Sequence, residues 1–176
     1  IRTIYIWEGG MSFHGGLIGI IASMIIFSRY KSIRFFQISD LVSSVAPIGL
    51  FFGRIANFIN TELYGRETDF PLAVIYPAID KLPRHPSQLY EALFEGLILF
   101  FLLAYHRKKH INKNSNGLIT SLFLIYYGIF RTLIEFLREP DTHLGLLFNF
   151  ISMGQLLSIP LIFIGVIIFY KINNDK

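Results

Sequence analysis

Two arginines, Arg54 and Arg131, lie inside long apolar stretches of the 176-residue sequence. A charge within a bilayer costs at least about 2.5–3.5 kcal/mol, so each guanidinium needs a compensating partner. A structural ion pair is one explanation, for instance between Arg131 and Glu135 one helical turn further on. We favour an anion site, because both arginines approach the same end of their spans and a planar guanidinium can donate two hydrogen bonds to phosphate.

The segment GRIANFINTELYG (53–65) places further polar groups around the first arginine. Arg54, Asn57 and Thr61 follow at i, i+3 and i+7, so a helix would carry them on one face. Gly65 is expected to end this helix. A helix–helix packing seam would account for the amide groups, but packing does not need a guanidinium.

A polar stripe accompanies the second arginine toward the same end of its span. Four residues share one side of a helix at i, i+4, i+8 and i+11: Tyr127, Arg131, Glu135 and Arg138. In this arrangement Glu135 would hold Arg131 in place while Arg131 binds an anion.

Two more segments begin apolar runs with polar residues. GGMSFHGG (9–16) surrounds His14 with four glycines. A lone histidine is more often structural than catalytic, but glycine pairs at a membrane boundary favour a functional role, because they let backbone or ligand approach closely. In the second segment, Gln88, Glu91 and Glu95 would share one helix face. Glu95 lies deeper in the apolar run as a protonated or paired acid, and its role stays open.

The composition indicates that a bilayer surrounds the elements that carry these residues. The chain is 53% hydrophobic and only 16% charged, with 18 Phe and 9 Tyr, whereas soluble domains carry about a quarter charged residues. Cysteine is absent, which excludes disulfides, thiolate metal sites and a cysteine nucleophile of the protein itself. The basic residues stand at the ends of apolar runs, a pattern typical of membrane topology and not of nucleic-acid binding.

Five segments reach the roughly 20 apolar residues that a membrane span needs. They cover about 11–28, 40–60, 88–106, 117–136 and 150–170. The sequence thus predicts an all-α, polytopic transmembrane helix bundle in a single domain (1–176), with an outer-face segment at about 61–87. Polar residues within the second and fourth spans must face protein or water.

Basic residues orient the bundle. Five alternating spans put the loops at 29–39 and 107–116 on the same side as the C-terminus, and these stretches hold nine of the 16 Lys and Arg. The opposite side holds five, and the remaining two lie within spans. The positive-inside rule therefore predicts a cytoplasmic C-terminus and polar groups that open to the outer face.

Three classes of function fit these features. A transporter of lipid or of anions would use Arg54 and Arg131 as a relay, but transporters usually place their site near the midplane, on interrupted helices within repeated halves. A structural membrane subunit would pair its arginines with acids. An enzyme acting at the outer leaflet fits the one-sided polar residues best.

The polar segments also resemble a known family. GRIANFINTELYG looks like the signature of the bacterial prolipoprotein diacylglyceryl transferases, and GGMSFHGGLIG, LPRHPSQLYE, YYGIFRTLIEFLREPD and ISMGQLLSIP resemble other blocks of that family in the same order. Family members have seven spans, so this chain resembles the last five. We expect it to be the C-terminal portion of a longer protein, because IRTIYIWE is neither a start nor a signal peptide. Thr61 stands where the family commonly has Gly.

The resemblance implies a transferase in the bacterial plasma (inner) membrane. The enzyme would transfer the diacylglyceryl group of phosphatidylglycerol, a membrane lipid, to the cysteine thiol of a lipobox in the signal peptide of a preprolipoprotein. The product is a thioether, and glycerol phosphate is released. The absence of cysteine agrees with a nucleophile that belongs to the substrate. The reaction requires no metal, and we expect no cofactor.

The chemistry of this reaction suggests roles for the polar residues. Arg54 and Arg131 would bind the lipid phosphate and stabilise the leaving group, and His14 is the candidate base for the thiol. Glu135 would orient Arg131. The headgroup site would be shaped by Asn57, Asn60, Glu62, Gly65 and Tyr127. The outer segment at 64–85 would either form part of the access for the signal peptide or act as an ordered cap.

Overall fold

The computed structural model describes residues 13–110, 116–139 and 152–174, with the side chains of residues 13 and 14 left out. The helices are α1 (Phe13–Lys31), α2 (Phe35–Ile59), α3 (Ser87–Glu91), the π-helical segment η3 (Ala92–Ile98), α4 (Leu99–Lys109), α5 (Leu118–Ile134) and α6 (Met153–Asn174). The strands are β1 (Val74–Ile75) and β2 (Pro83–Arg84). The all-α class is confirmed, and a two-stranded antiparallel hairpin is added to it.

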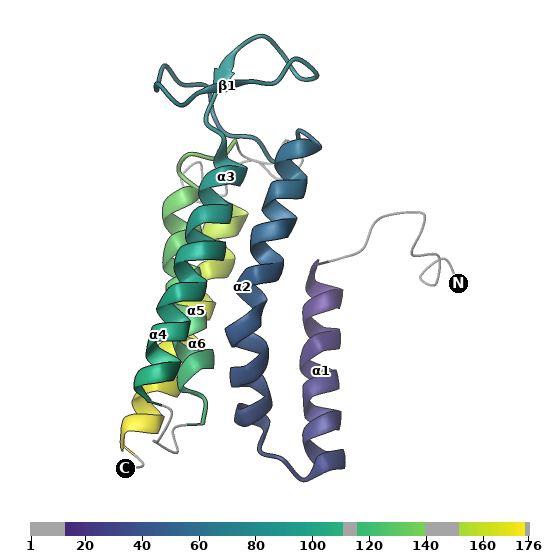
Figure 1. Cartoon of the computed structure of the whole chain (residues 1–176), viewed down its shortest axis with the longest axis vertical. Coiled ribbons are helices and arrows are strands. Elements are labelled where there is room, and N and C mark those ends of the chain that lie inside the picture. Colours follow the sequence, from purple (N-terminus) through teal and green to yellow (C-terminus); the bar gives the residue numbers. More distant parts are fainter. Residues whose placement is uncertain (1–12, 111–115, 140–151, 175–176) are drawn as a thin grey trace, which may run out of the picture.

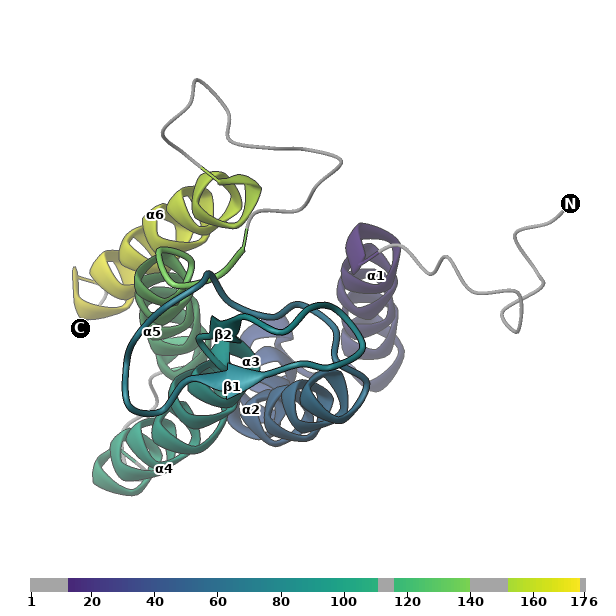
Figure 2. The same ribbon diagram turned by 90° about the horizontal axis from the view of Figure 1, so that it is seen from above.

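The long helices run side by side along the long axis of the molecule, and α3, η3 and α4 form one continuous rod (Figures 1 and 2). The rod, α2 and α5 pack against one another, α6 packs on α5, and α1 packs on the opposite side of α2. The chain between α2 and α3 (residues 60–86), which we call the head segment, covers one end of the bundle and carries the hairpin.

Glycines set the closest approaches between these helices. A Cβ on Gly128 of α5 would lie 2.5 Å from Ile162 of α6, and one on Gly96 of η3 would lie 2.7 Å from Phe51 of α2. Small residues let helix backbones come close where water is absent, and close packing is then the main attractive force. These contacts fix the spacing of α2, the rod and α5, which carry the charged residues described below.

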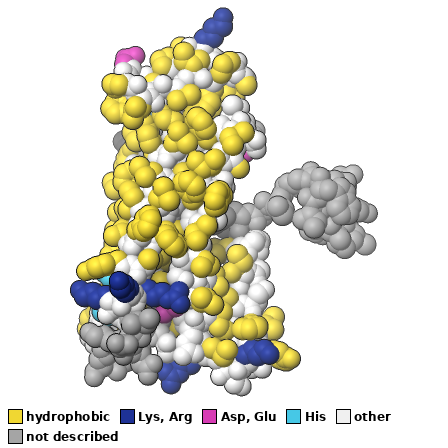
Figure 3. Space-filling model, in the orientation of Figure 1, with side chains coloured by type: hydrophobic (Ala, Val, Ile, Leu, Met, Phe, Trp, Pro, Cys, Tyr) yellow, Lys and Arg dark blue, Asp and Glu magenta, His cyan; other side chains and the backbone are white. Residues whose placement is uncertain are grey.

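Among the residues that the structure describes, three helices are long and apolar enough to cross a membrane: Phe35–Ile59, the rod Ser87–Lys109, and Met153–Asn174. The outward face is rich in large apolar side chains, whereas buried positions include Ser, Gln, Glu and Arg. Figure 3 shows hydrophobic side chains along the helices, with Lys and Arg gathered at the end opposite the head segment. An apolar exterior around polar buried groups is expected for a helix bundle in lipid.

The end of α2 differs from the prediction. The helix stops at Ile59, and Thr61 and Leu63 take left-handed φ values of 57° and 56°. Thr61 is therefore not on the helix face of Arg54, and the expectation that Gly65 ends the helix was wrong. The turn is held from α3: Gln88 Nε2 donates to the Glu62 carbonyl at 2.6 Å, and Ser87 Oγ donates to the Leu63 carbonyl at 2.9 Å.

Asp40 of α2 caps the start of α5. Its carboxylate accepts hydrogen bonds from the backbone N–H groups of Gly117 at 2.7 Å and Thr120 at 2.8 Å, and from the Thr120 hydroxyl at 2.7 Å. The first N–H groups of a helix have no partner within the helix, so this side chain replaces a local N-cap.

We therefore expect Asp40→Ala to lower the free energy of unfolding by about 1–2 kcal/mol, the usual cost of losing an N-cap. Thermal unfolding in detergent micelles measures the loss. Asp69→Ala, at an exposed position of the head segment, is the control and should leave the melting temperature nearly unchanged. Equal melting temperatures for both variants would contradict the capping role.

Candidate functional site

Glu91 joins the two arginines that the sequence singled out. Its Oε2 lies 3.1 Å from Arg54 Nε of α2, and its Oε1 pairs with Arg131 Nη1 of α5. The Glu91 side chain has no exposed surface, and the arginines are 16% and 10% exposed. One carboxylate therefore fixes two guanidiniums from different helices at a short distance from each other.

Glu95, one turn deeper in η3, is a second buried carboxylate between the same arginines. Its Oε2 lies 3.4 Å from Arg54 Nη2 and its Oε1 lies 3.7 Å from Arg131 Nη1. Spacing of four residues keeps Glu91 and Glu95 on one side of the rod. Short π-helical segments such as η3 occur frequently at functional sites.

The cluster continues along α5 toward the head segment. Arg131 Nη2 pairs with Glu135 Oε2 at 2.7 Å, which is the ion pair considered in the sequence. The same Glu135 oxygen lies 3.9 Å from Arg138 Nη1. Three arginines thus face three glutamates in what we call the arginine–glutamate cluster, and in its ionised form the cluster is neutral.

The other residues predicted to form the headgroup site differ in how deeply they are buried. Asn57 is half-buried one turn beyond Arg54, whereas Asn60 and Glu62 are exposed at the end of α2 and in the turn that follows. Tyr127 lies one turn before Arg131 on α5 and stacks on Phe123, with ring centroids 5.7 Å apart. His14 lies in the first turn of α1, but its side chain is outside what the structure describes.

Gly65 lies where the head segment meets the end of α5. Its N–H donates to the His85 carbonyl and the N–H of Arg66 donates to the Leu137 carbonyl, both at 2.9 Å. Gly65 also forms a backbone bridge with Arg138. The head segment is therefore tied to the chain just after the C-terminal end of α5, next to the cluster.

Arg84 holds the head segment together from inside. Its guanidinium donates to Asp80 Oδ2 at 2.7 Å and to the Gly65 carbonyl at 3.3 Å, and it stacks on Tyr64 with Cζ 5.0 Å from the ring centroid. It also lies 3.5 Å from both Glu67 and Glu139. The hydrogen bonds from Arg84 lower the pKa of the Asp80 carboxyl, so this pair stays charged in the neutral range.

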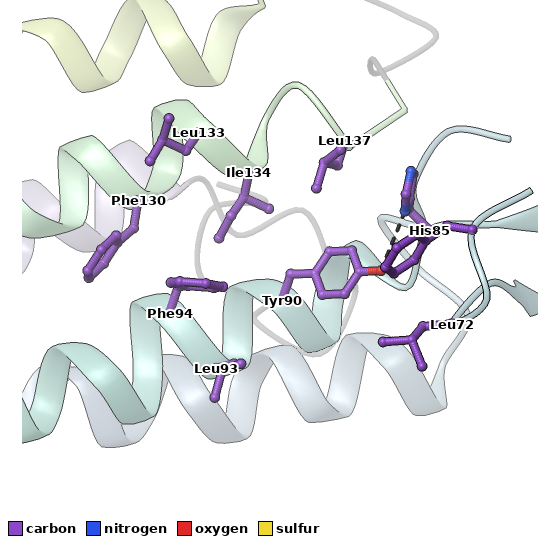
Figure 4. A pocket seen from close by; sticks show the side chains of 10 residues that line it. Leu72, His85, Tyr90, Leu93, Phe94, Phe130, Leu133, Ile134 and Leu137 are labelled. Carbon is purple, nitrogen blue, oxygen red and sulfur yellow. Dashed lines mark hydrogen bonds between the residues drawn. The ribbon is translucent and has the colours of Figure 1, made fainter. Parts of the chain in front are cut away.

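An apolar pocket of about 570 Å³ lies beneath the head segment, between the rod and α5. Figure 4 shows its walls, which come from α3, η3, α5 and the head segment: Phe70, Leu72, His85, Tyr90, Leu93, Phe94, Phe130, Leu133, Ile134 and Leu137. The polar groups at its rim, His85 Nδ1 and the Tyr90 hydroxyl, contact each other at 3.4 Å. The pocket therefore suits an apolar chain and offers little to a charged headgroup.

Sequence reasoning placed Glu91 and Glu95 on one helix face but left them out of the site. Their four-residue spacing in an apolar run was a usable signal, because two buried acids need cations and only two arginines lie within spans. The bonding role of Arg84 had no such signal, since its partners are spread from Tyr64 to Glu139.

The family model described as prolipoprotein diacylglyceryl transferase matches residues 1–171. A phosphatidylglycerol–prolipoprotein diacylglyceryl transferase of Rickettsia bellii is 50% identical over 171 residues, which cover 97% of this chain and 65% of that protein. The enzyme of the same name from Idiomarina loihiensis is 51% identical over 99% of this chain and 65% of its own length. That of Pasteurella multocida is 55% identical over 93% of this chain and 60% of its own.

The chain thus spans a little less than two thirds of the length of these curated relatives. With its three long apolar helices it is a multi-pass membrane protein. The family model matches nearly all of its residues, and the curated relatives have about half of their aligned residues in common with it. The chain therefore belongs to the prolipoprotein diacylglyceryl transferase family.

Proposed function

We propose that the full-length gene product transfers the diacylglyceryl group of phosphatidylglycerol to the lipobox cysteine of preprolipoproteins. The observation that carries this proposal is the arginine–glutamate cluster, in which Arg54 and Arg131 from two helices are fixed by one buried carboxylate. The names of relatives that are about half identical give the substrates, phosphatidylglycerol and a prolipoprotein. The family does not favour the transporter alternative.

The reaction breaks the bond between a glycerol carbon and a phosphate oxygen and forms a carbon–sulfur bond to the cysteine. The thiol must lose its proton, and His14 is the base that we propose, because imidazole titrates in the useful range. The departing glycerol phosphate gains charge. Arg54 and Arg131 supply preorganised donors for that charge in a place that water scarcely reaches.

The remaining assignments concern the lipid headgroup. Asn57 lies one turn from Arg54 and Tyr127 one turn from Arg131, so both border the phosphate position that the arginines define. Asn60, Glu62 and Gly65 belong to the head segment, where they would meet the glycerol of the headgroup. Glu135 orients Arg131 through their 2.7 Å contact.

We further propose that the protein lies in the bacterial inner membrane with its C-terminus in the cytoplasm and its site open to the outer face. The basic residues at the end of α1 (Arg29, Lys31) and of α4 (Arg107, Lys108, Lys109) support this orientation. The head segment then lies on the outer side, where exported signal peptides arrive. Its apolar pocket supports a part in their access, beside its structural role as a cap.

A reconstitution tests the proposed function. The full-length gene product is mixed with phosphatidylglycerol and a lipobox peptide, and mass spectrometry follows the peptide. A mass increase on the cysteine equal to a diacylglyceryl group is the expected result. A folded, lipid-supplied preparation that gives no adduct contradicts the transferase, and movement of labelled lipid between leaflets without chemical change would identify a transporter.

The same assay tests the base. If His14 takes the thiol proton, His14→Gln should lose most of the rate at neutral pH. A variant that keeps most of its rate would remove His14 as the base and leave the rest of the proposal intact.

A further inference from the structure

The charge balance of the arginine–glutamate cluster limits how it can take up an anion. Arg54 and Arg131 face two wholly buried carboxylates, Glu91 and Glu95, and a third Arg–Glu pair continues the cluster. A phosphodiester headgroup brings one more negative charge. An uncompensated charge in a buried site is strongly destabilising. Binding of such a headgroup therefore requires that one carboxylate either take up a proton or move away from the arginines.

The contacts distinguish the three carboxylates. Glu91 is bound through both oxygens, with Arg54 at 3.1 Å and Arg131 closer still. Glu135 is bound to Arg131 at 2.7 Å. Each of the three glutamates has one buried oxygen with no hydrogen-bond partner among the described residues, so the distances decide: Glu95 has only long contacts, at 3.4 and 3.7 Å. Glu95 is therefore the carboxylate that the arginines hold least firmly.

We propose that Glu95 is the exchangeable counter-ion of this site: it neutralises the arginines while the site is empty and takes up a proton from water when an anionic phosphodiester headgroup binds. This inference rests on the proposed function, because it assumes that Arg54 and Arg131 hold the lipid phosphate. Glu95 acts through the two guanidiniums and is a positioning residue. Its place one turn deeper than Glu91 lets it release the arginines while Glu91 keeps them aligned.

The groups that face Glu95 come from each element packed around it: Arg54 from α2, Glu91 from α3, and Tyr127 and Arg131 from α5. Arginine keeps its charge at every working pH, and an ordinary phenol ionises only near pH 10. Both carboxylates contact the arginines through both oxygens, but Glu91 does so at shorter distances than Glu95. Glu95 is thus the group whose protonation can follow lipid binding.

The experiment measures binding of phosphatidylglycerol to the full-length gene product in phosphatidylcholine nanodiscs, between about pH 6 and pH 9, with no thiol peptide present. Uptake of one proton on binding makes Kd rise by up to about tenfold per pH unit. A wild-type Kd that does not change with pH overturns the proposal without any variant.

Glu95→Gln keeps the shape of the side chain and removes its charge. It should bind phosphatidylglycerol more tightly than wild type at the upper end of the pH range and lose most of the pH dependence. Glu91→Gln, one turn away, is the matched comparison and should bind more weakly at every pH, because it loosens both arginines. Glu95→Asp should restore the pH dependence.

Each outcome separates the two proposals. If wild-type protein neither binds phosphatidylglycerol nor modifies the peptide, the proposed function fails. If it does both, and Glu95→Gln keeps the wild-type pH dependence or weakens binding as much as Glu91→Gln, only the role of Glu95 is overturned. Melting temperatures show whether each variant has folded. If Glu95→Gln does not fold, the pH dependence of the wild-type Kd tests the role of Glu95 by itself.

Discussion

Arg131→Ala is expected to reduce diacylglyceryl transfer by at least about 10²–10³-fold, the usual loss when one preorganised donor to a developing oxyanion is removed. The effect should exceed that of most single changes, because Arg131 contacts Glu91, Glu95 and Glu135 and is only 10% exposed. Removing one partner of a buried ion pair also costs about 3–5 kcal/mol, since the remaining charge is left without compensation. Both the rate and the melting temperature should therefore fall.

Mass spectrometry of the lipobox peptide measures the rate, and thermal unfolding in detergent separates lost chemistry from lost structure. Arg131→Lys keeps the charge but cannot donate two hydrogen bonds from one planar group. Compared with Arg131→Ala, it should therefore restore the melting temperature more than the transfer rate. Arg107→Ala is the control: Arg107 lies at the other end of the bundle and donates to Ser44 Oγ at 3.0 Å. A near-normal rate for Arg131→Ala would refute its contact with the phosphate.

Gly65→Ala is expected to detach the head segment from the bundle. A Cβ at this position would lie 2.4 Å from the His85 carbonyl oxygen and 2.7 Å from the Leu137 carbonyl oxygen. These are backbone atoms, which cannot move aside as a flexible side chain can. Overpacking of this kind costs about 1–3 kcal/mol. Here that cost falls on the backbone hydrogen bonds that join residues 65–66 to His85 and Leu137.

Hydrogen exchange at the amides of Gly65, Arg66 and His85 should accelerate in Gly65→Ala, and proteases should cut residues 60–86 more readily. Transfer activity should fall as well, because the segment lies directly beyond the arginine–glutamate cluster. Gly49→Ala is the matched control, since nothing in the described residues lies within 4 Å of a Cβ there. Unchanged protection of the three amides in Gly65→Ala would contradict this role of the glycine.

Charge and hydrophobic periodicity predicted that the chain is helical, but they did not predict where each helix ends. The end of α2 shows why. GRIANFINTELYG continues the helical spacing to Thr61, yet the helix stops at Ile59 because Gln88 and Ser87 of α3 bind the carbonyls of Glu62 and Leu63. Those bonds come from residues about 25 positions away, so no local pattern could contain them.

The sequence by itself determined the helical class, the apolar exterior and the need of Arg54 and Arg131 for partners, because each follows from local composition and the cost of charge in lipid. It also placed Glu91 and Glu95 on one helix face. Only the tertiary structure decided which acids meet which arginines, since three helices must pack before the contacts exist. That packing puts Glu91 across both guanidiniums and leaves Glu95 loosely held, and the charge balance that follows is a property of the assembled bundle.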